Sequence, residues 1–321
     1  MNIIYIACAI FILIGLKFLS SFLVYLILSI FLTILIYPVV AFFEKRGFPI
    51  FVGYIFSAIL VFIIFGSMLM IVDSSLKEFI NNASFYHHKF NLAFEELNRY
   101  LKKFNLKIDF SIINSIDFVQ IIKLFLAKAS SLVSGFLVVF IGVSFMIFES
   151  KNFGKKIELI TNNKEMLKIF FKNTQKYYLI KTLMSALTGL LVTIMLLYFN
   201  IPYAYLFGIM AFLFNYIPVI GSIVAAIPGI FMSFVTYDIN TAIYVTIGYL
   251  IINNLISNVL EPKFLGDGLD LSPAVVFFSL LLWGWVFGIV GMFLAAPLTM
   301  TLKLALMSNQ KTKWIALLLS K

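Results

Sequence analysis

Three polar side chains at the end of a long apolar run have the chemistry to bind a small solute or ion. Asn254, Asn258 and Glu261 occupy helix positions i, i+4 and i+7 and therefore share one face. The amides can ligate Na⁺ through oxygen or hydrogen-bond a hydroxylated solute, and the carboxylate can hold a cation or carry a proton. Two alternatives stay open: the asparagines join neighbouring helices, or Glu261 pairs with Lys263 at the membrane interface.

A second candidate is Asn215, three residues before Pro218. Proline has no N–H, so a backbone carbonyl is expected to be free nearby; simple helix packing is the alternative. Asn215 lies in residues 202–235, an apolar stretch too long for one straight crossing. Helix breaks are predicted at Pro218, Gly221, Pro228, Pro262, Gly288, Gly291 and Pro297.

The composition places this chain among polytopic integral membrane proteins. Of its 321 residues, 62% are hydrophobic and 12% charged, which is more apolar side chain than one soluble core could bury. The net charge of +10 comes mostly from lysines between apolar runs, where topology and anionic lipid headgroups account for them, so no nucleic-acid partner is expected. The single cysteine, Cys8, allows neither an intrachain disulfide nor a thiolate metal site.

The apolar runs predict an all-α fold of about eight transmembrane helices, two of them broken by glycine and proline. Basic residues follow the second and fourth runs, so the positive-inside rule places both termini in the cytoplasm. The N-terminal run lacks the features of a signal peptide and is expected to be a retained span. The expected divisions are 1–73 (helices 1–3), 74–130 (extracytoplasmic), 131–148 (helix 4), 149–176 (basic cytoplasmic loop), 177–306 (transmembrane core) and 307–321 (cytoplasmic tail).

The outer segment, residues 74–130, carries an apolar stripe with the spacing of an amphipathic helix. We expect this helix to pack on its neighbour; the alternative is that the stripe meets another subunit or lies on the membrane surface. The adjacent His87 and His88 point to different helix faces and make a poor metal pair, so both are expected at the surface. The stripe consists of Leu76, Ile80, Ala83, His87, Phe90, Phe94, Leu97, Leu101 and Phe104.

The two broken segments are related at a spacing of 70 residues. Matching Gly/Pro-interrupted segments are a sequence indication of a transporter's binding site, although apolar sequences rich in glycine and alanine can also coincide by chance. The loop at 261–270 lies outside if each broken segment crosses once, and inside if both form hairpins. The matched pairs include Ala204 with Ala274, Phe207 with Phe277, Gly221 with Gly291, and Ala225–Ala226 with Ala295–Ala296.

Three motifs together resemble the autoinducer-2 exporter family of bacterial membrane proteins: FNYIPVIGSIVAAIPGI (214–230), NVLEPKFLGDGLDLSP (258–273) and WGWVFGIVGMFLAAPLT (283–299). The likeness is dense over residues 177–306. It implies an inner-membrane transport protein that forms a homo-oligomer, with a pentamer expected. The family's Asn-Tyr-Ile-Pro motif maps onto residues 215–218 and its Glu-Pro-basic motif onto 261–263. Lys263 stands where arginine is common, which weakens any bidentate grip on an anion.

These observations predict a transporter that exports a small polar solute, with ion coupling left open. Sodium/proton antiport is the alternative within transport, and a non-transporting membrane scaffold is the alternative of another class. No enzyme and no cofactor are expected, because the sequence contains no H-E-x-x-H, no Cys/His ligand set and no G-x-S-x-G. Besides the solute or Na⁺/H⁺, the expected partners are membrane lipids and further copies of the chain.

Overall fold

The computed structural model describes residues 3–103, 135–150, 164–218, 220–265, 271–307 and 312–320, and these form helices without strands. Five helical stretches are long and apolar enough to cross a membrane: α2 (Ser20–Lys45), α3 (Ile50–Asn81), Phe171–Tyr198 of α7 (Lys164–Tyr198), Ile239–Leu265, and α12 (Pro273–Phe293). Shorter apolar helices are Gly135–Ser150, α8 (Ala204–Phe214), α9 (Ile220–Thr236) and α13 (Ala295–Met307). The prediction of an all-helical, polytopic membrane protein is confirmed.

The chain divides into two compact units. The first comprises Met1–Val61, Ser134–Thr182 and Pro262–Lys321, and the second Phe62–Val133 and Leu183–Glu261. Both units are assembled from segments far apart in sequence, and α3 and α7 each contribute to both. Each unit is described by itself.

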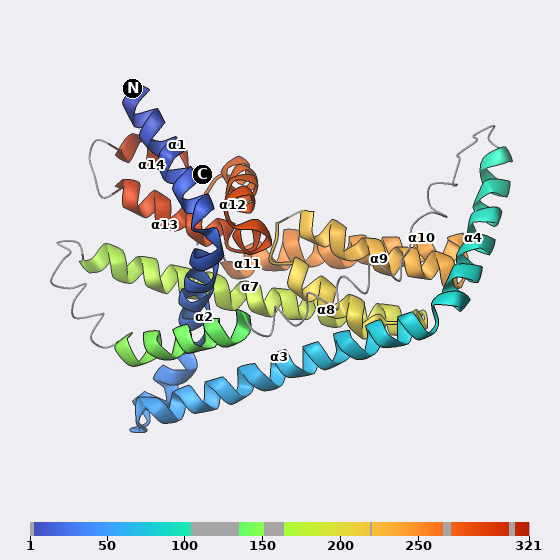
Figure 1. Cartoon of the computed structure of the whole chain (residues 1–321), viewed down its shortest axis with the longest axis horizontal. Coiled ribbons are helices and arrows are strands. Elements are labelled where there is room, and N and C mark those ends of the chain that lie inside the picture. Colours follow the sequence, from blue (N-terminus) through green and yellow to red (C-terminus); the bar gives the residue numbers. More distant parts are fainter. Residues whose placement is uncertain are drawn as a thin grey trace. The chain divides into compact units, whose positions relative to one another are not determined.

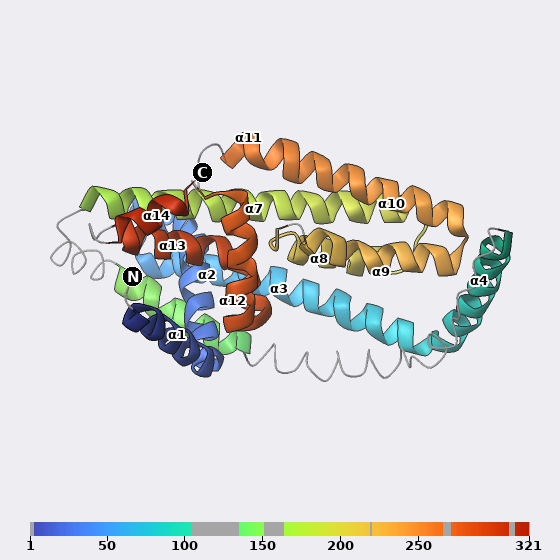
Figure 2. The ribbon, with the colours of Figure 1, turned by 90° about the horizontal axis from the view of Figure 1, so that it is seen from above.

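The second unit is built around α9, which packs against α8, α10 (Ile239–Asn254) and α4 (Ala83–Lys103). Figures 1 and 2 show α9 and α10 side by side, with α4 at one end of α9. The fully buried side chains of its core include Val192, Leu196 and Val245. Because lipid is as apolar as these side chains, close packing rather than water exclusion holds such helices together.

Helix α4 packs on its neighbour through aromatic rings. The Phe90 ring lies 5.7 Å from that of Phe231, and the Phe94 ring lies 5.8 Å from that of Phe234, measured between centroids. Phe90 is buried, whereas His87 and His88 are exposed. This part of the stripe therefore packs against α9 of the same chain. Residues 104–130 lie outside the described ranges.

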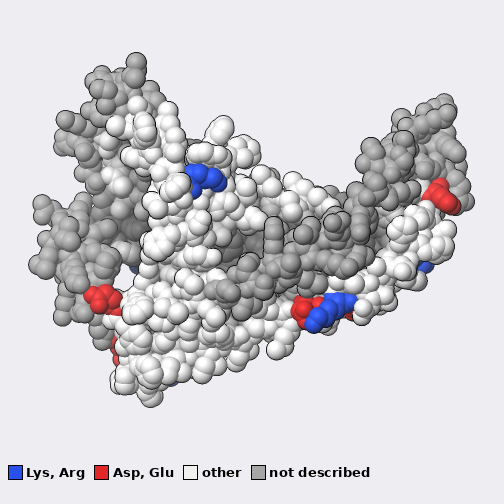
Figure 3. All heavy atoms as spheres, in the orientation of Figure 1, with Lys and Arg blue, Asp and Glu red and all other residues white. Residues whose placement is uncertain are grey.

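In the first unit, α12 contacts α1 (Ile3–Phe18), α2 and α13, and α13 contacts α14 (Lys313–Leu318). Phe31 of α2 joins three elements, because its ring meets Tyr178 of α7 at 4.2 Å and Phe293 of α12 at 5.5 Å. Large apolar side chains on α1, α2 and α3 point outward, and charged groups are sparse on the face in Figure 3. A surface of this kind suits contact with lipid acyl chains.

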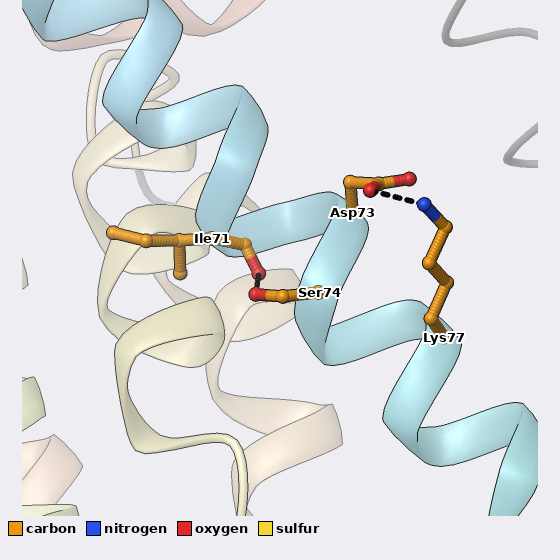
Figure 4. Close-up of polar contacts among 4 residues, drawn as sticks. All are labelled: Ile71, Asp73, Ser74 and Lys77. Carbon is orange, nitrogen blue, oxygen red and sulfur yellow. Dashed lines mark hydrogen bonds and ion pairs between the residues drawn. The ribbon is translucent and has the colours of Figure 1, made fainter.

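Two helices are longer than the apolar runs predict. Helix α3 continues to Asn81 instead of ending at Asp73. Within this extension, Lys77 forms an i, i+4 ion pair with Asp73, with 2.7 Å between the ammonium nitrogen and the carboxylate oxygen (Figure 4). Both charges are largely exposed, so the pair adds only about 0.3–0.5 kcal/mol. Helix α7 begins at Lys164, inside the stretch expected to be a loop. Hydropathy marks the apolar part of a helix, whereas lysine and glutamate are themselves good helix formers.

Local caps set the starts of α10 and α12. The backbone N–H of Thr241 donates to the Asp238 carboxylate at 2.7 Å, which holds the pKa of that carboxyl below its ordinary value. The Asp238 cap stabilises the folded protein fully above the pKa of about 4 that the carboxyl has in the unfolded chain. That stabilisation is lost as the pH falls through the lower pKa that the carboxyl has in the folded protein. Helix α12 begins with Ser272, whose hydroxyl accepts from the Val275 N–H, and with proline at the first helical position.

Replacing Phe90 with alanine is expected to loosen α4 from α9, because a buried phenylalanine truncated to alanine costs about 3–5 kcal/mol. Hydrogen exchange of the α4 amides in the purified protein should become at least roughly 100-fold faster. The control is Phe85→Ala on the same helix, where the ring is 54% exposed. Equal exchange in the two variants would contradict the packing of α4 on α9.

Candidate functional site

The stretch with Asn254, Asn258 and Glu261 contains a π-helical turn. Helix α10 continues through η1 (Leu255–Leu260), a π-helix, into α11 (Glu261–Leu265). The Glu261 N–H bonds to the carbonyl of Ile256, five residues back, instead of to that of Ser257. The next residue, Pro262, has no N–H to offer. The Ser257 carbonyl therefore receives no bond from residue 261 or 262, the donors that an α-helix or a π-helix would supply. π-Helical turns of this kind often mark functional sites.

The structure brings the two asparagines of this stretch together. Asn258 Nδ2 donates to Asn254 Oδ1 at 2.8 Å, and Asn254 Nδ2 donates to the carbonyl of Leu250 at 2.9 Å. Both asparagines are exposed, as is Lys263, and Glu261 is half-buried. The prediction that Glu261 shares their face assumed 3.6 residues per turn; the wider π turn shifts Glu261 from that position.

The first broken segment separates α8 from α9. Helix α8 ends with Asn215 as its C-cap, and α9 begins at Ile220. Asn215 is 4% exposed, and its Nδ2 donates to Ser185 Oγ of α7 at 3.0 Å. The buried amide thus ties the end of α8 to α7. Pro218 lies in the turn, and its carbonyl accepts from the Ile220 N–H at 2.7 Å.

The second broken segment turns at Gly288, whose φ of 65° and ψ of −146° interrupt α12. Three residues earlier, the carbonyl of Trp285 accepts a hydrogen bond from the Lys17 ammonium at 2.6 Å. Trp283 Nε1 donates to Thr299 Oγ1 at 2.9 Å, so a buried hydrogen bond joins α12 to α13. Leu294 caps α12 and separates it from α13.

The predicted helix breaks are not alike. Helix α9 runs through Pro228 without interruption, so the break expected there is wrong. Pro297 lies in the first turn of α13, where a missing N–H costs nothing, and Pro262 follows the π turn without ending the helix. Membrane helices tolerate internal proline because neighbouring groups re-satisfy the freed backbone. The turns themselves are formed at Pro218 and Gly288.

The two broken segments share one close approach of backbone to backbone. Pro218, between α8 and α9, and Gly288, inside α12, are 70 residues apart. A Cβ on Gly221 would lie 1.9 Å from the Phe214 carbonyl oxygen, and a Cβ on Gly291 would lie 1.9 Å from that of Trp283. Only glycine permits this approach of two backbones. Gly221 and Gly291, which are 70 residues apart, therefore meet the same steric constraint.

Sequence reasoning missed the polar face of α7. Lys181 is only 4% exposed, although a lysine near the end of an apolar run ordinarily extends its stem toward the membrane interface. Lys303 is 5% exposed within α13. The signal in the sequence is a spacing of 7, 4 and 3 residues, which places four polar side chains on one face of α7: Thr174, Lys181, Ser185 and Thr188.

Comparison with known proteins identifies the family. A model described as AI-2E family transporter matches residues 6–309, nearly the whole chain. The chain belongs to the AI-2E transporter family. It is 34% identical to a Haemophilus influenzae protein with a provisional transport-protein name, over 98% of this chain and 94% of that protein. It is 31% identical to the AI-2 transport protein TqsA of Escherichia coli K12, over 96% of this chain and 92% of TqsA.

Membership of the AI-2E family confirms the resemblance carried by the three motifs. Together with the membrane-spanning helices, it makes this chain a multi-pass membrane transport protein. The relatives' names are those of transport proteins and not of enzymes. Among the residues that the structure describes, no group of three His, Cys, Asp or Glu side chains could hold a metal ion.

Alanine at Gly221 or Gly291 should destabilise the protein by about 1–3 kcal/mol or more, because the added Cβ meets a backbone oxygen that cannot move aside. Thermal melting of the detergent-purified protein measures this. Gly66→Ala in α3 is the matched control, since nothing lies within 4 Å of its Cβ position and alanine favours a helix. A melting temperature that falls equally in all three variants would argue against the two close approaches.

Ser185→Ala should cost about 1–3 kcal/mol, because it leaves the buried Asn215 amide without its acceptor. The double variant Ser185→Ala, Asn215→Leu should recover much of that loss, since both polar partners are then removed. Ser67→Ala, at an exposed serine on α3, serves as control. Additive losses in the double variant would show that the hydrogen bond does not hold the end of α8.

Proposed function

We propose that this AI-2E family transporter moves a small polar solute out of the cell across the bacterial inner membrane. The observation that carries the proposal is the π turn Leu255–Leu260, where the Glu261 N–H bonds to Ile256 and Pro262 has no N–H, so neither residue donates to the Ser257 carbonyl. It stands on a membrane-spanning helix beside the amides of Asn254 and Asn258. Polar groups within a membrane span cost free energy because lipid does not solvate them, and they commonly mark the path of a solute or ion.

The two broken segments support the same proposal. Helix breaks at membrane depth are tolerated where the freed backbone groups are buried in protein or line a cavity. Here each break is bounded by buried polar contacts, Asn215 with Ser185 at the first and Trp283 with Thr299 at the second. In transporters, paired interruptions of this kind accompany the substrate site.

Sidedness and assembly belong to the proposal as well. Lysines following the second and fourth apolar runs favour cytoplasmic termini by the positive-inside rule. Kinship with TqsA, which is named as an AI-2 transport protein, favours a transport function, and we propose export as its direction. The broad apolar surface accommodates lipid and further copies of the chain, and we propose a homo-oligomer, with the pentamer of the family resemblance as its form.

Monovalent cation/proton antiport is the second candidate. Backbone and amide oxygens on the π turn and the half-buried Glu261 carboxylate that follows it are ligand types that suit a hard cation such as Na⁺. In antiport Glu261 would exchange Na⁺ for a proton, whereas in solute export it would accept hydrogen bonds from the solute's hydroxyl groups.

Flux in purified proteoliposomes separates these functions. Labelled autoinducer-2 should cross the membrane of vesicles that hold the wild-type protein, whereas a Na⁺ pulse should leave an enclosed pH dye unchanged. The opposite pattern would replace export by antiport. If neither solute nor ion moves in vesicles that contain correctly assembled protein, the transport proposal fails and a non-transporting membrane scaffold becomes the favoured function.

Glu261→Gln should lower the flux roughly tenfold to hundredfold, because a hydrogen bond to a charged group contributes about 1.5–3 kcal/mol. The matched control is Asp73→Asn, an exposed carboxylate on α3 that is paired with Lys77 outside this stretch. Gel filtration establishes that both variants assemble. Wild-type flux in Glu261→Gln would remove Glu261 from the mechanism while leaving the transport proposal intact.

A further inference from the structure

We propose that α14 (Lys313–Leu318) is an interfacial helix that binds the anionic headgroups of the bilayer around the protein. The inference concerns a surface of the first unit and does not depend on which solute the protein moves. It is carried by an exposed apolar face on a short helix that is attached to one end of a membrane span and flanked by lysines.

Helix α14 is held in place at both of its ends. At its start, the Thr312 hydroxyl donates to the carbonyl of Leu306 in α13 at 2.7 Å. At its end, the carbonyl of Leu319 accepts from the Ser272 N–H at 3.2 Å. Between these two bonds the side chain of Ala316 is fully buried, and Figures 1 and 2 show α14 beside α13. The segment therefore presents a fixed face and not a frayed end.

The outward face of α14 is apolar. Trp314, Leu317 and Leu318 occupy positions i, i+3 and i+4 and therefore lie together on one side of the helix. Their side chains are 53%, 58% and 69% exposed. A helix of six residues is about 9 Å long, which is too short to cross a hydrocarbon core of about 30 Å. A short helix with tryptophan and leucine on one side suits the boundary between headgroups and acyl chains.

The bond to Ser272 attaches α14 to one end of a membrane span. Ser272 is the N-cap of α12, and the stretch that is long and apolar enough to cross a membrane begins at the next residue, Pro273. The end of a spanning helix lies at the level of the lipid headgroups, because the apolar stretch fills the hydrocarbon core. The apolar face of α14 is therefore fixed where headgroups and acyl chains meet.

The charge around this face is positive. Lys313 is exposed within α14, and Lys311 and Lys321 flank the helix in the sequence, outside the described residues. No acidic residue follows Asp270 in the sequence, so residues 271–321 carry lysines and no side-chain carboxylate. Each lysine near a membrane surface favours contact with anionic lipid by about fivefold.

Anionic lipid fits this face better than a second copy of the chain does. A twofold contact between two such faces would bring their lysines together, which like-charge repulsion opposes. Phospholipid satisfies both parts of the surface at once, because its acyl chains contact Trp314 and the leucines while its phosphate groups attract the lysines.

Quenching of tryptophan fluorescence by brominated lipid tests this inference in the full-length protein. All vesicles contain the same mixture of phosphatidylglycerol and phosphatidylcholine, and either the anionic or the neutral lipid carries bromine on its acyl chains near the headgroup. The chain has three tryptophans, so the difference between wild type and Trp314→Phe gives the Trp314 signal. At low salt the anionic lipid should quench this signal at least roughly fivefold more strongly. Equal quenching by the two lipids overturns the inference.

Charge variants identify the groups responsible. In the triple variant Lys311→Gln, Lys313→Gln, Lys321→Gln, the ratio of quenching by the two lipids should fall to about one while Trp314 stays in contact with lipid. The matched control is Lys77→Gln, at an exposed lysine of the second unit, which should keep the wild-type ratio. A preference for anionic lipid that survives the triple variant does not come from these lysines, and the inference then fails.

The same measurement detects a protein that covers this face. If neither lipid quenches Trp314, another copy or another protein occupies the face, and the inference is overturned. The double variant Leu317→Asn, Leu318→Asn changes two exposed side chains and should lower quenching by both lipids, because the face then loses its apolar contact. Thermal melting establishes that the variants fold. No solute enters the experiment, so its outcome is independent of the proposed transport function.

Discussion

Inside a bilayer every backbone N–H and C=O must find its partner within the protein, because lipid offers none. Most of this chain meets that constraint with uninterrupted helices. Regular α-helix is interrupted at the turn at Pro218, at Gly288 and at the π turn Leu255–Leu260. At the first and second, side-chain hydrogen bonds and glycine-mediated backbone contacts surround the turn. At the third, neither Glu261 nor Pro262 donates to the Ser257 carbonyl, and the candidate site is built around this turn.

The same cost applies to charge. Most charged side chains that the structure describes are half-buried or exposed, as those of the Asp73–Lys77 pair are. Lys181 and Lys303 are exceptions, because their side chains are enclosed by the first unit. A charged group in such surroundings needs a compensating partner or a functional reason, and a polar helix face offers both.

Both broken segments of the C-terminal half bring a glycine close to an earlier backbone oxygen. In each segment the glycine three residues past the turn lies so near an earlier carbonyl oxygen that no side chain fits. The segments nevertheless differ in what holds them: Asn215 ties the first to α7, whereas Lys17 and Thr299 engage tryptophans of the second. The two segments thus share a close glycine–carbonyl approach but are held by different hydrogen bonds.

The sequence by itself determined the helical membrane fold, the two broken segments and the family, because hydropathy, glycine and proline act locally and leave direct marks in the chain. It also placed Asn254 next to Asn258, since both lie on one helix four residues apart. Only the tertiary structure decided the π turn that shifts Glu261, the continuity of α9 through Pro228, and the burial of Lys181. Whether a lysine is enclosed or reaches the interface depends on helices distant in sequence, and the width of a turn depends on the packing around it. Neither is a local property of the residues concerned.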